Sequence, residues 1–165
     1  MNSTYQRFNI IIGWLIFLIA LYTYLKTMEP TGSFWDCGEY IACAYKLEIG
    51  HPPGAPLFLL IGRLFSFLAM GDTAKVGMML NSMSASCSAF TILFLFWTIT
   101  AMAYKIIIKT GELTKGKMLA ILGAGSVGAL AYAFSDSFWF SAVEGEVYAM
   151  SSFFTAVTFW AILRW

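Results

Sequence analysis

Apolar residues gather in five stretches along this chain, separated by shorter polar segments. The stretches cover about residues 8–25, 57–70, 76–104, 118–134 and 147–163. A helix needs about 20 apolar residues, within a range of about 17–25, to cross about 30 Å of hydrocarbon. Four of the stretches are long enough, and the pattern predicts that they span a membrane. The stretch at residues 57–70 is too short and carries Arg63 near its middle.

The distribution of Lys and Arg favours a four-span topology over a five-span one. An arginine at the centre of a span costs about 2.5–3.5 kcal/mol on insertion scales, so residues 57–70 fit an interfacial helix better. With four spans, Arg7, the basic loop at residues 104–117 and Arg164 all lie on one side of the membrane. That side is cytoplasmic by the positive-inside rule. We therefore expect a cytoplasmic N-terminus and an outer loop at residues 26–75.

The outer loop begins with a predicted short helix over about residues 34–47. The sequence SFWD fits a capping box, in which Ser33 is the N-cap residue and Asp36 stands three residues further on. The helix must end before the His-Pro-Pro that follows Gly50, because proline cannot continue a helix. A second interfacial helix is predicted over about residues 56–70. The expected fold class is all-α integral membrane, with about four transmembrane helices and two short interfacial helices.

Composition supports a membrane protein and narrows its partners. The 165 residues are 59% hydrophobic and 12% charged, whereas soluble domains are about 45–50% apolar and about 25% charged. The net charge of +1 provides no basic surface for nucleic acid. The hydrophobic composition instead predicts that the lipid bilayer is a partner of this chain. The chain ends on AILRW, where the last apolar stretch ends. We expect residues 1–165 to be a single transmembrane module of a longer multi-span protein.

Titratable side chains concentrate in the predicted outer segments. On a helix, Asp36, Glu39 and Tyr40 share one face, because they are three and four residues apart. Two neighbouring carboxylates can supply a general base, an orienting partner or metal ligands. The only histidine of the chain, His51, precedes two prolines that restrict its backbone. The last outer loop adds three more acids: Asp136, Glu144 and Glu146.

Each of these groups also has an interpretation without chemistry. Asp36 would then be only the capping-box acid, and Glu39 would be solvated or paired with Lys46 or Arg63. His51 would lie at the surface, and the two later glutamates would face water. Residue spacing alone leaves these alternatives open, because a lone pair of acids is a weak signal.

Three motifs, in order along the chain, resemble those of one family of membrane enzymes. A D-x-G-E pattern occupies residues 36–39, a G-H-P-P-G-x-P-L pattern occupies residues 50–57, and the segment AVEGEVYAMSSFF occupies residues 142–154. With the order of span, acidic helix, proline-led helix and span, they resemble the GT-C membrane glycosyltransferases. Within that class the resemblance is closest to the protein O-mannosyltransferase-like family, once labelled a domain of unknown function and common in Bacteroidetes.

The resemblance implies an activity and assigns roles to residues. A GT-C enzyme would move a sugar, here mannose, from a polyprenyl-phosphate donor to a hydroxyl of an exported protein on the periplasmic or luminal face. The resemblance implies that Asp36 is the catalytic base and that Glu39 orients Asp36 or the acceptor. It also implies that no cofactor or metal is needed. The residues expected to bind substrate are His51, Tyr40, Arg63, Lys46, Glu146 and Tyr148.

Two other functions are compatible with parts of the sequence. A non-catalytic scaffold or assembly subunit would use small-residue helix faces such as residues 123–131. A transporter would place charged residues inside its spans, but the cores of the four predicted spans contain none. The localisation that follows from the resemblance is the bacterial inner membrane, with the active face periplasmic.

Overall fold

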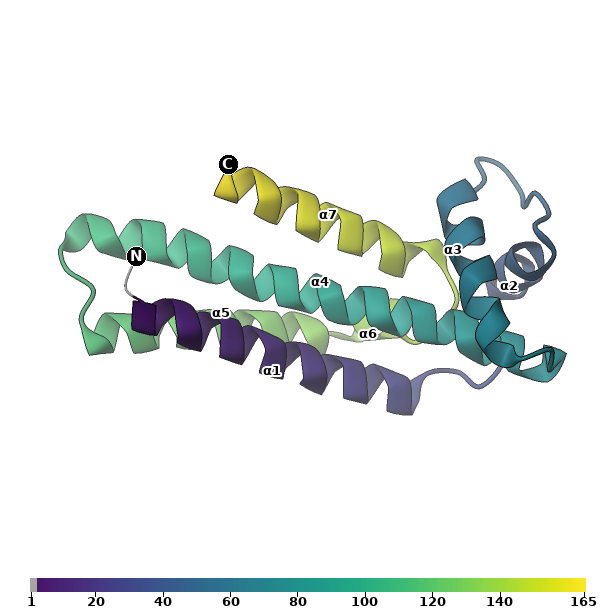
Figure 1. Cartoon of the computed structure of the whole chain (residues 1–165), viewed down its shortest axis with the longest axis horizontal. Coiled ribbons are helices and arrows are strands. Elements are labelled where there is room, and N and C mark those ends of the chain that lie inside the picture. Colours follow the sequence, from purple (N-terminus) through teal and green to yellow (C-terminus); the bar gives the residue numbers. More distant parts are fainter. Residues whose placement is uncertain (1–2) are drawn as a thin grey trace.

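The computed structural model describes residues 3–165, which form helices and no strands (Figure 1). Four helices are long and apolar enough to cross a membrane: α1 (Ser3–Thr27), α4 (Val76–Ile107), α5 (Lys115–Ala133) and α7 (Val147–Arg164). The shorter α-helices are α2 (Cys37–Lys46), α3 (Pro56–Ser66) and α6 (Asp136–Ala142). Single 3₁₀ turns cover Phe67–Ala69, Thr73–Lys75 and Ile108–Thr110. The predicted fold class, all-α with four spans and two short helices after the first, is confirmed.

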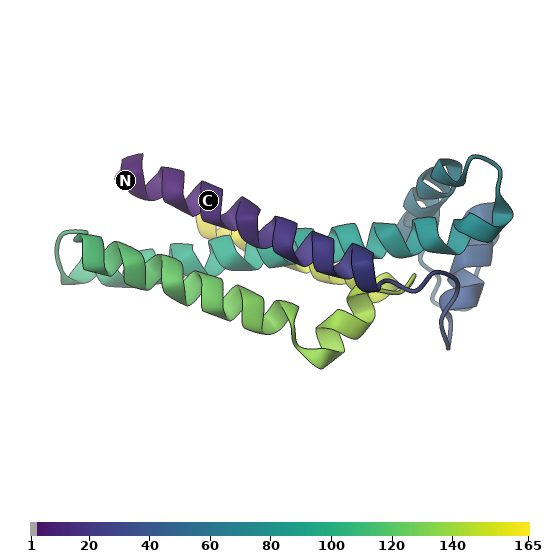
Figure 2. The ribbon, with the colours of Figure 1, turned by 90° about the horizontal axis from the view of Figure 1, so that it is seen from below.

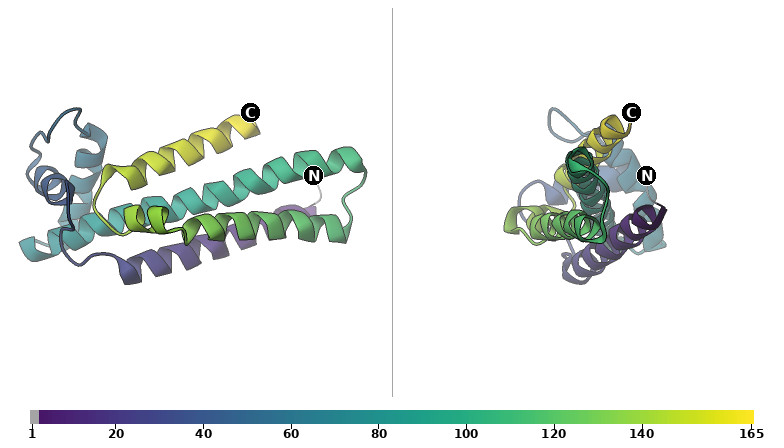
Figure 3. Two further views of the ribbon diagram at one scale, coloured as in Figure 1. Left: turned by 180° about the vertical axis from the view of Figure 1, so that it is seen from behind. Right: turned by 90° about the vertical axis from the view of Figure 1, so that its left-hand side faces the viewer.

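The helix α4 is the centre of the bundle, and α1, α5 and α7 all pack along it (Figure 3). Small residues permit the closest of these approaches. A Cβ atom added at Gly125 of α5 would lie 2.5 Å from Cγ2 of Thr100 on α4. Lipid tails are as apolar as leucine, so spans associate mainly through such close packing.

One end of α4 carries the two short helices that lie between α1 and α4 in the sequence. α4 has 32 residues and is therefore about 48 Å long, more than the hydrocarbon core requires. Its first turns extend beyond the neighbouring spans and hold α2 and α3 (Figures 1 and 2). Leu80 and Met83 of α4 are buried in one apolar cluster with Ala44 and Phe58. We call residues 28–75 the lobe.

The four spans alternate in direction. The N-terminus of α1 and the C-terminus of α7 both lie at the end of the bundle away from the lobe (Figures 1 and 3). The connection between α4 and α5 lies at that same end, whereas α6 lies toward the lobe. This is the arrangement that four crossings require. The assignment of the lobe to the outer face stays a prediction.

Two local predictions are wrong. Ser33 does not cap the first helix of the lobe, because α2 begins only at Cys37 and its N-cap residue is Asp36, without a side-chain capping bond. The hydroxyl of Ser33 donates to the carboxylate of Glu144, in the loop between α6 and α7. The other error concerns the segment after α5, predicted to be a loop, where α6 forms because it buries Phe138 against Tyr24 of α1.

Candidate active site

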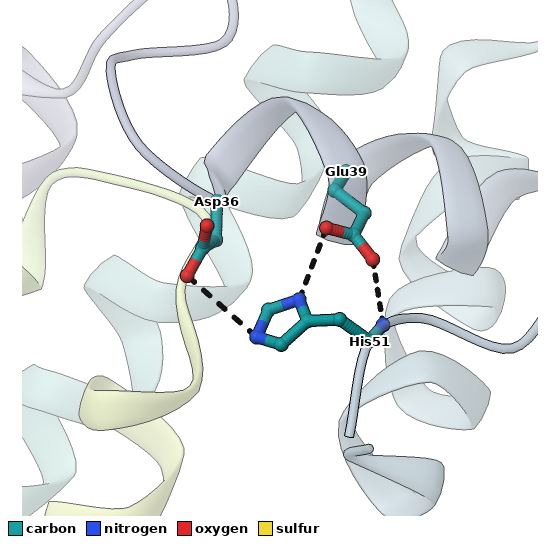
Figure 4. Close-up of side chains that lie close together, drawn as sticks. All are labelled: Asp36, Glu39 and His51. Carbon is teal, nitrogen blue, oxygen red and sulfur yellow. Dashed lines mark hydrogen bonds and ion pairs between the residues drawn. The ribbon is translucent and has the colours of Figure 1, made fainter. Parts of the chain in front are cut away.

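Three side chains of the lobe meet at the start of α2 (Figure 4). Asp36 is the N-cap residue and Glu39 lies in the first turn, while His51 stands in the loop that leads to α3. Both oxygens of Glu39 interact with His51: Oε1 accepts from the backbone N–H at 2.7 Å, and Oε2 is 3.0 Å from ring Nδ1. The other ring nitrogen, Nε2, lies 3.8 Å from Oδ2 of Asp36. The histidine is therefore held by one carboxylate and faces the other.

His51 returns to Glu39 because α2 ends sharply. Leu47 adopts the left-handed conformation, with φ of 56°, and its N–H donates to the carbonyl of Cys43, a common way to end a helix. Gly50 then brings the backbone close to the carboxylate, since a Cβ atom there would lie 3.2 Å from Oε1 of Glu39. The turn closes with a hydrogen bond of 2.9 Å from the N–H of Gly54 to the carbonyl of His51. The glycine-rich loop thus sets the position of the histidine.

The Glu39–His51 pair favours the charged form of both partners. Hydrogen bonds from the backbone and the ring of His51 hold the pKa of Glu39 below its ordinary value. The hydrogen bond and the charge of Glu39 raise the pKa of His51, and Asp36 adds to the rise. Asp36 differs from Glu39, because its contact with the ring is longer and its side chain is 57% exposed. Its carboxylate is the more exposed of the two, since the side chain of Glu39 is 40% exposed.

Tyr40 supports the ring of His51 from the side of α2. The centroid of its ring lies 5.8 Å from that of His51 and 5.5 Å from that of Phe58 on α3. Burial raises the pKa of Tyr40, and the carboxylates of Asp36 and Glu39 raise it further. The phenol therefore keeps its proton beside the two acids and can donate a hydrogen bond.

Two buried acids join the site from the loop between α6 and α7. Glu144 is 3% exposed and Glu146 is 7% exposed, so the interpretation in which they face water is wrong. Burial raises the pKa of both carboxyls, and the charges of Glu144 and Asp36 raise that of Glu146 further. Among the described residues, neither acid forms an ion pair with a cation. Figure 4 shows this loop passing beside Asp36.

The same three lobe residues are the ones whose chemistry suits a cation. Asp36, Glu39 and His51 each offer one ligand atom, and these atoms lie within 4.8 Å of one another. Both oxygens of Glu39 already interact with His51, but a carboxylate oxygen that accepts one hydrogen bond keeps a lone pair for a cation. The arrangement is therefore compatible with hydrogen bonding and proton transfer and also with coordination of a cation.

Comparison with known proteins places this site in a family. Residues 36–165 match the family model described as Protein O-mannosyl-transferase TMEM260 N-terminal domain. The chain belongs to this family. Protein O-mannosyl-transferase tmem260 of Dictyostelium discoideum is 27% identical over 143 residues, which are 87% of this chain and 16% of that relative. No solved structure matches the chain.

The TMEM260 N-terminal domain match confirms the resemblance drawn from the three motifs. It begins at Asp36 and extends through the loop that carries Glu144 and Glu146. The elements that build the site thus lie within the part of the chain that defines the family. The chain spans 16% of the length of the Dictyostelium relative, so the comparison concerns only a small part of that protein.

The structure brings together some of the predicted site residues of this module and separates others. Asp36, Glu39, Tyr40 and His51 are in contact or adjacent, and the charge of Asp36 acts on Glu146. Tyr148, in the first turn of α7, follows two residues after Glu146 and is 60% exposed. These residues form one group at the lobe end of the bundle.

The two basic side chains predicted to bind substrate lie near the other end of α2. Lys46 is the last residue of the helix, about 15 Å from its start by helix rise, and its ammonium is 3.9 Å from Glu48. Arg63 of α3 donates to the carbonyl of Tyr45 and lies over the rings of Tyr45 and Phe67. Neither interacts with Glu39, so the alternative that paired this acid with one of them is wrong. Their predicted role toward a phosphate stays a prediction.

Sequence reasoning missed Asn81, although a signal for it was present. Asn81 lies in α4 and is 0% exposed, and its amide donates to the carbonyls of Glu29 and Thr31 at 2.7 and 2.8 Å. It therefore anchors the segment that leads into Asp36. An asparagine inside an apolar helix needs a partner, and that requirement was the available signal. Nothing in the sequence showed which carbonyls would accept.

Proposed function

We propose that this chain is the N-terminal module of a GT-C membrane glycosyltransferase that moves mannose from a polyprenyl-phosphate donor to a hydroxyl of an exported protein. The observation that carries the proposal is the open carboxylate of Asp36 beside a bonded Glu39–His51 pair. This group lies at one end of four membrane-spanning helices, in a family described by the words Protein O-mannosyl-transferase. A site at the edge of the membrane suits a lipid-borne donor and a water-borne acceptor.

Asp36 is the proposed general base. Its side chain is 57% exposed, and Nε2 of His51, at 3.8 Å, lies beyond hydrogen-bonding distance of its carboxylate. The acceptor hydroxyl would lose its proton to a carboxylate oxygen of Asp36 as its oxygen attacks the anomeric carbon. The bond between that carbon and the donor phosphate breaks, and the polyprenyl phosphate leaves with the bonding electrons. A base positioned in this way contributes about 10²–10⁴-fold to a rate.

Glu39 and His51 have supporting roles in this proposal. Glu39 is held by two hydrogen bonds, so it orients His51 rather than exchanging protons itself. A protonated His51 can donate through Nε2 to the leaving phosphate or to Asp36 after proton transfer. Tyr40 adds a phenolic donor, and Glu146 and Tyr148 are proposed to close the site from the α7 side. Arg63 and Lys46 are proposed to meet the donor phosphate where α2 ends.

The test uses the full-length parent protein in membrane vesicles. Transfer of labelled mannose from polyprenyl-phosphate-mannose to an exported protein acceptor is followed for wild type and Asp36→Asn, with and without chelator. We expect wild-type transfer to continue in the presence of chelator, and the variant to lose at least about 10²-fold. Glu48→Gln is the matched control, because it removes an exposed acid that lies just beyond the other end of α2.

The outcomes separate the competing functions. Equal transfer by wild type and Asp36→Asn would remove Asp36 from the chemistry. If wild type transfers no sugar from polyprenyl-phosphate-mannose, polyprenyl-phosphate-glucose or other donors of this kind, the non-catalytic scaffold function is favoured. Loss of wild-type transfer on chelation, restored by a divalent cation, would overturn the metal-independent form of the proposal and assign a cation to the carboxylates.

A further inference from the structure

The segment that delivers Asp36 to the site is held by a small number of contacts. Residues 28–36 form no helix between the end of α1 and the start of α2. The N–H of Glu29 donates to the carbonyl of Val143 at 3.0 Å, and Asn81 binds the carbonyls of Glu29 and Thr31. Further along, the hydroxyl of Ser33 donates to the buried carboxylate of Glu144. After Ser33 the chain continues directly to Asp36.

The two residues between Ser33 and Asp36 have no comparable support. Phe34 is 86% exposed and Trp35 is 87% exposed. Trp35 also adopts a left-handed backbone conformation, with φ of 62°, which a residue with a large side chain rarely takes. Such a conformation persists only when the structure on both sides holds it. On the C-terminal side that support is α2, and on the N-terminal side it is Ser33, whose hydroxyl donates to Glu144 and which also interacts with the buried thiol of Cys37.

Glu144 is built into the fold as an acceptor. Its side chain is buried, and Gly145 next to it packs so closely that a Cβ atom there would lie 2.9 Å from Oδ1 of Asn81. The loop between α6 and α7 is thereby fixed against both α4 and the lobe. A buried carboxylate without a cation is costly, and a fold that needed only packing here would be served by an apolar side chain.

We propose that the Ser33–Glu144 hydrogen bond positions Asp36 for proton removal, so that Glu144 is a positioning residue for the sugar transfer. This inference rests on the proposed function, in which Asp36 is the base. The bond links the first outer segment to the loop before α7, two parts of the sequence that are 111 residues apart. The bond therefore ties the segment that carries the base to the loop that precedes α7.

The experiment compares variants of the full-length protein in membrane vesicles, with rates expressed per folded molecule. Ser33→Ala and Glu144→Ala should each lower kcat about tenfold, because small displacements of a reacting group have large effects on rate. KM for the donor should stay within about twofold, since the donor-binding groups are untouched. Glu144→Gln should recover most of the rate, because its amide oxygen can accept the same hydroxyl hydrogen.

The double variant and a matched control make the test specific. If both residues act through one bond, Ser33→Ala combined with Glu144→Ala should be no slower than the slower single variant. Thr31→Ala is the matched control, because it removes a hydroxyl from the same segment. Thr31 is exposed and is bound through its backbone carbonyl, which the substitution leaves in place. The kcat of this variant should match that of wild type. Multiplied losses in the double variant, or wild-type kcat in Ser33→Ala, would overturn the proposal.

A second measurement separates this inference from the proposed function. Hydrogen exchange at Tyr40, whose N–H donates to the carbonyl of Asp36 at 3.0 Å, should be faster in Ser33→Ala than in wild type or Thr31→Ala, whatever reaction the protein catalyses. Unchanged exchange would overturn the positioning role. Faster exchange in a protein that transfers no sugar would uphold the positioning role and refute the proposed function alone.

Discussion

The bundle and the lobe are both joined by side-chain hydrogen bonds between distant parts of the sequence, but the groups that form these bonds differ. In the bundle, aromatic side chains donate to backbone carbonyls of neighbouring helices, as Tyr24 does to Ala133 and Trp97 does to Asn9. In the lobe, carboxylates are the acceptors: Glu39 accepts from His51, and Glu144 accepts from Ser33.

Charge separates the two regions in the same way. The cores of the spans lack Asp, Glu, Lys and Arg, and small residues such as Gly125 set the distances between helices. The lobe and the α6–α7 loop concentrate acids instead, two of them buried without a cation among the described residues. Apolar packing therefore sets the position of the lobe, and a small set of polar side chains in it makes up the candidate active site. Changes in the bundle should alter stability, and changes in the lobe should alter activity.

The largest expected effect concerns the two carboxylates of α2. Asp36→Asn should lower kcat by at least about 10²-fold, while Glu39→Gln should lower it only about tenfold, because it disturbs the position of His51 rather than the base. The thermal midpoint of unfolding in detergent should stay close to wild type for Asp36→Asn. Mannose transfer per folded molecule is the measurement. A larger loss for Glu39→Gln than for Asp36→Asn would assign the role of base to Glu39 and the positioning role to Asp36.

In the bundle, Gly125→Val should destabilise without affecting chemistry. The added side chain would meet Thr100 and Phe96 of α4, and such overpacking costs about 1–3 kcal/mol. The midpoint of thermal unfolding in detergent measures it, together with transfer per folded molecule. Gly123→Ala is the matched control, because nothing lies within 4 Å of a Cβ atom there. An equal shift in both variants would contradict the assigned contact.

A smaller effect is expected from pH on the loop that carries His51. The charged Glu39–His51 pair stabilises this loop above the lowered pKa of Glu39 and below the raised pKa of His51, whose ordinary values are 4.5 and 6.5. The contribution of His51 is thus present below 6.5 and is lost as pH rises through its raised pKa. Amide exchange at His51 and Gly54, whose N–H groups donate to Glu39 and to the carbonyl of His51, should accelerate over that rise after correction for intrinsic rates. The acceleration should be absent in His51→Gln, and the same pH dependence in that variant would refute the assignment.

The smallest effect is a gain in stability from Glu146→Gln. Burial raises the pKa of this acid, so the folded state is favoured at low pH and loses stability as pH rises through that pKa. The variant should unfold about 2–4 °C higher at pH 8, equivalent to about 1 kcal/mol, and the gain should shrink toward pH 4. Glu48→Gln, which changes an exposed acid, should show no such pH-dependent gain. A lower midpoint for Glu146→Gln at pH 8 would mean that the surroundings stabilise the charged carboxylate of Glu146 in the wild type.

Much of the lobe could be anticipated because proline and glycine are local signals for helix ends and turns. The start of α3 at Pro56 follows from such a residue, and the prolines after His51 require α2 to end before them, although its last turn is closed by Leu47. Proximity of Asp36 and Glu39 followed from helix periodicity. Contact between Glu39 and His51 did not, because it depends on the direction that the chain takes after Leu47. The roles given to these residues were drawn from resemblance and stay predictions.

The sequence by itself determined the helices that span the membrane, their alternating order and the family to which the chain belongs. Hydrophobic length and motif spacing are local properties, and they can be read without knowing which segments meet. Only the tertiary structure decided that Ser33 binds Glu144 rather than capping α2, that Glu144 and Glu146 are buried, and that Asn81 holds the segment before Asp36. These contacts join segments about 50 to 111 residues apart. Their formation depends on how α4, α6 and α7 pack, since a polar group chooses its partner only among those that packing brings within reach.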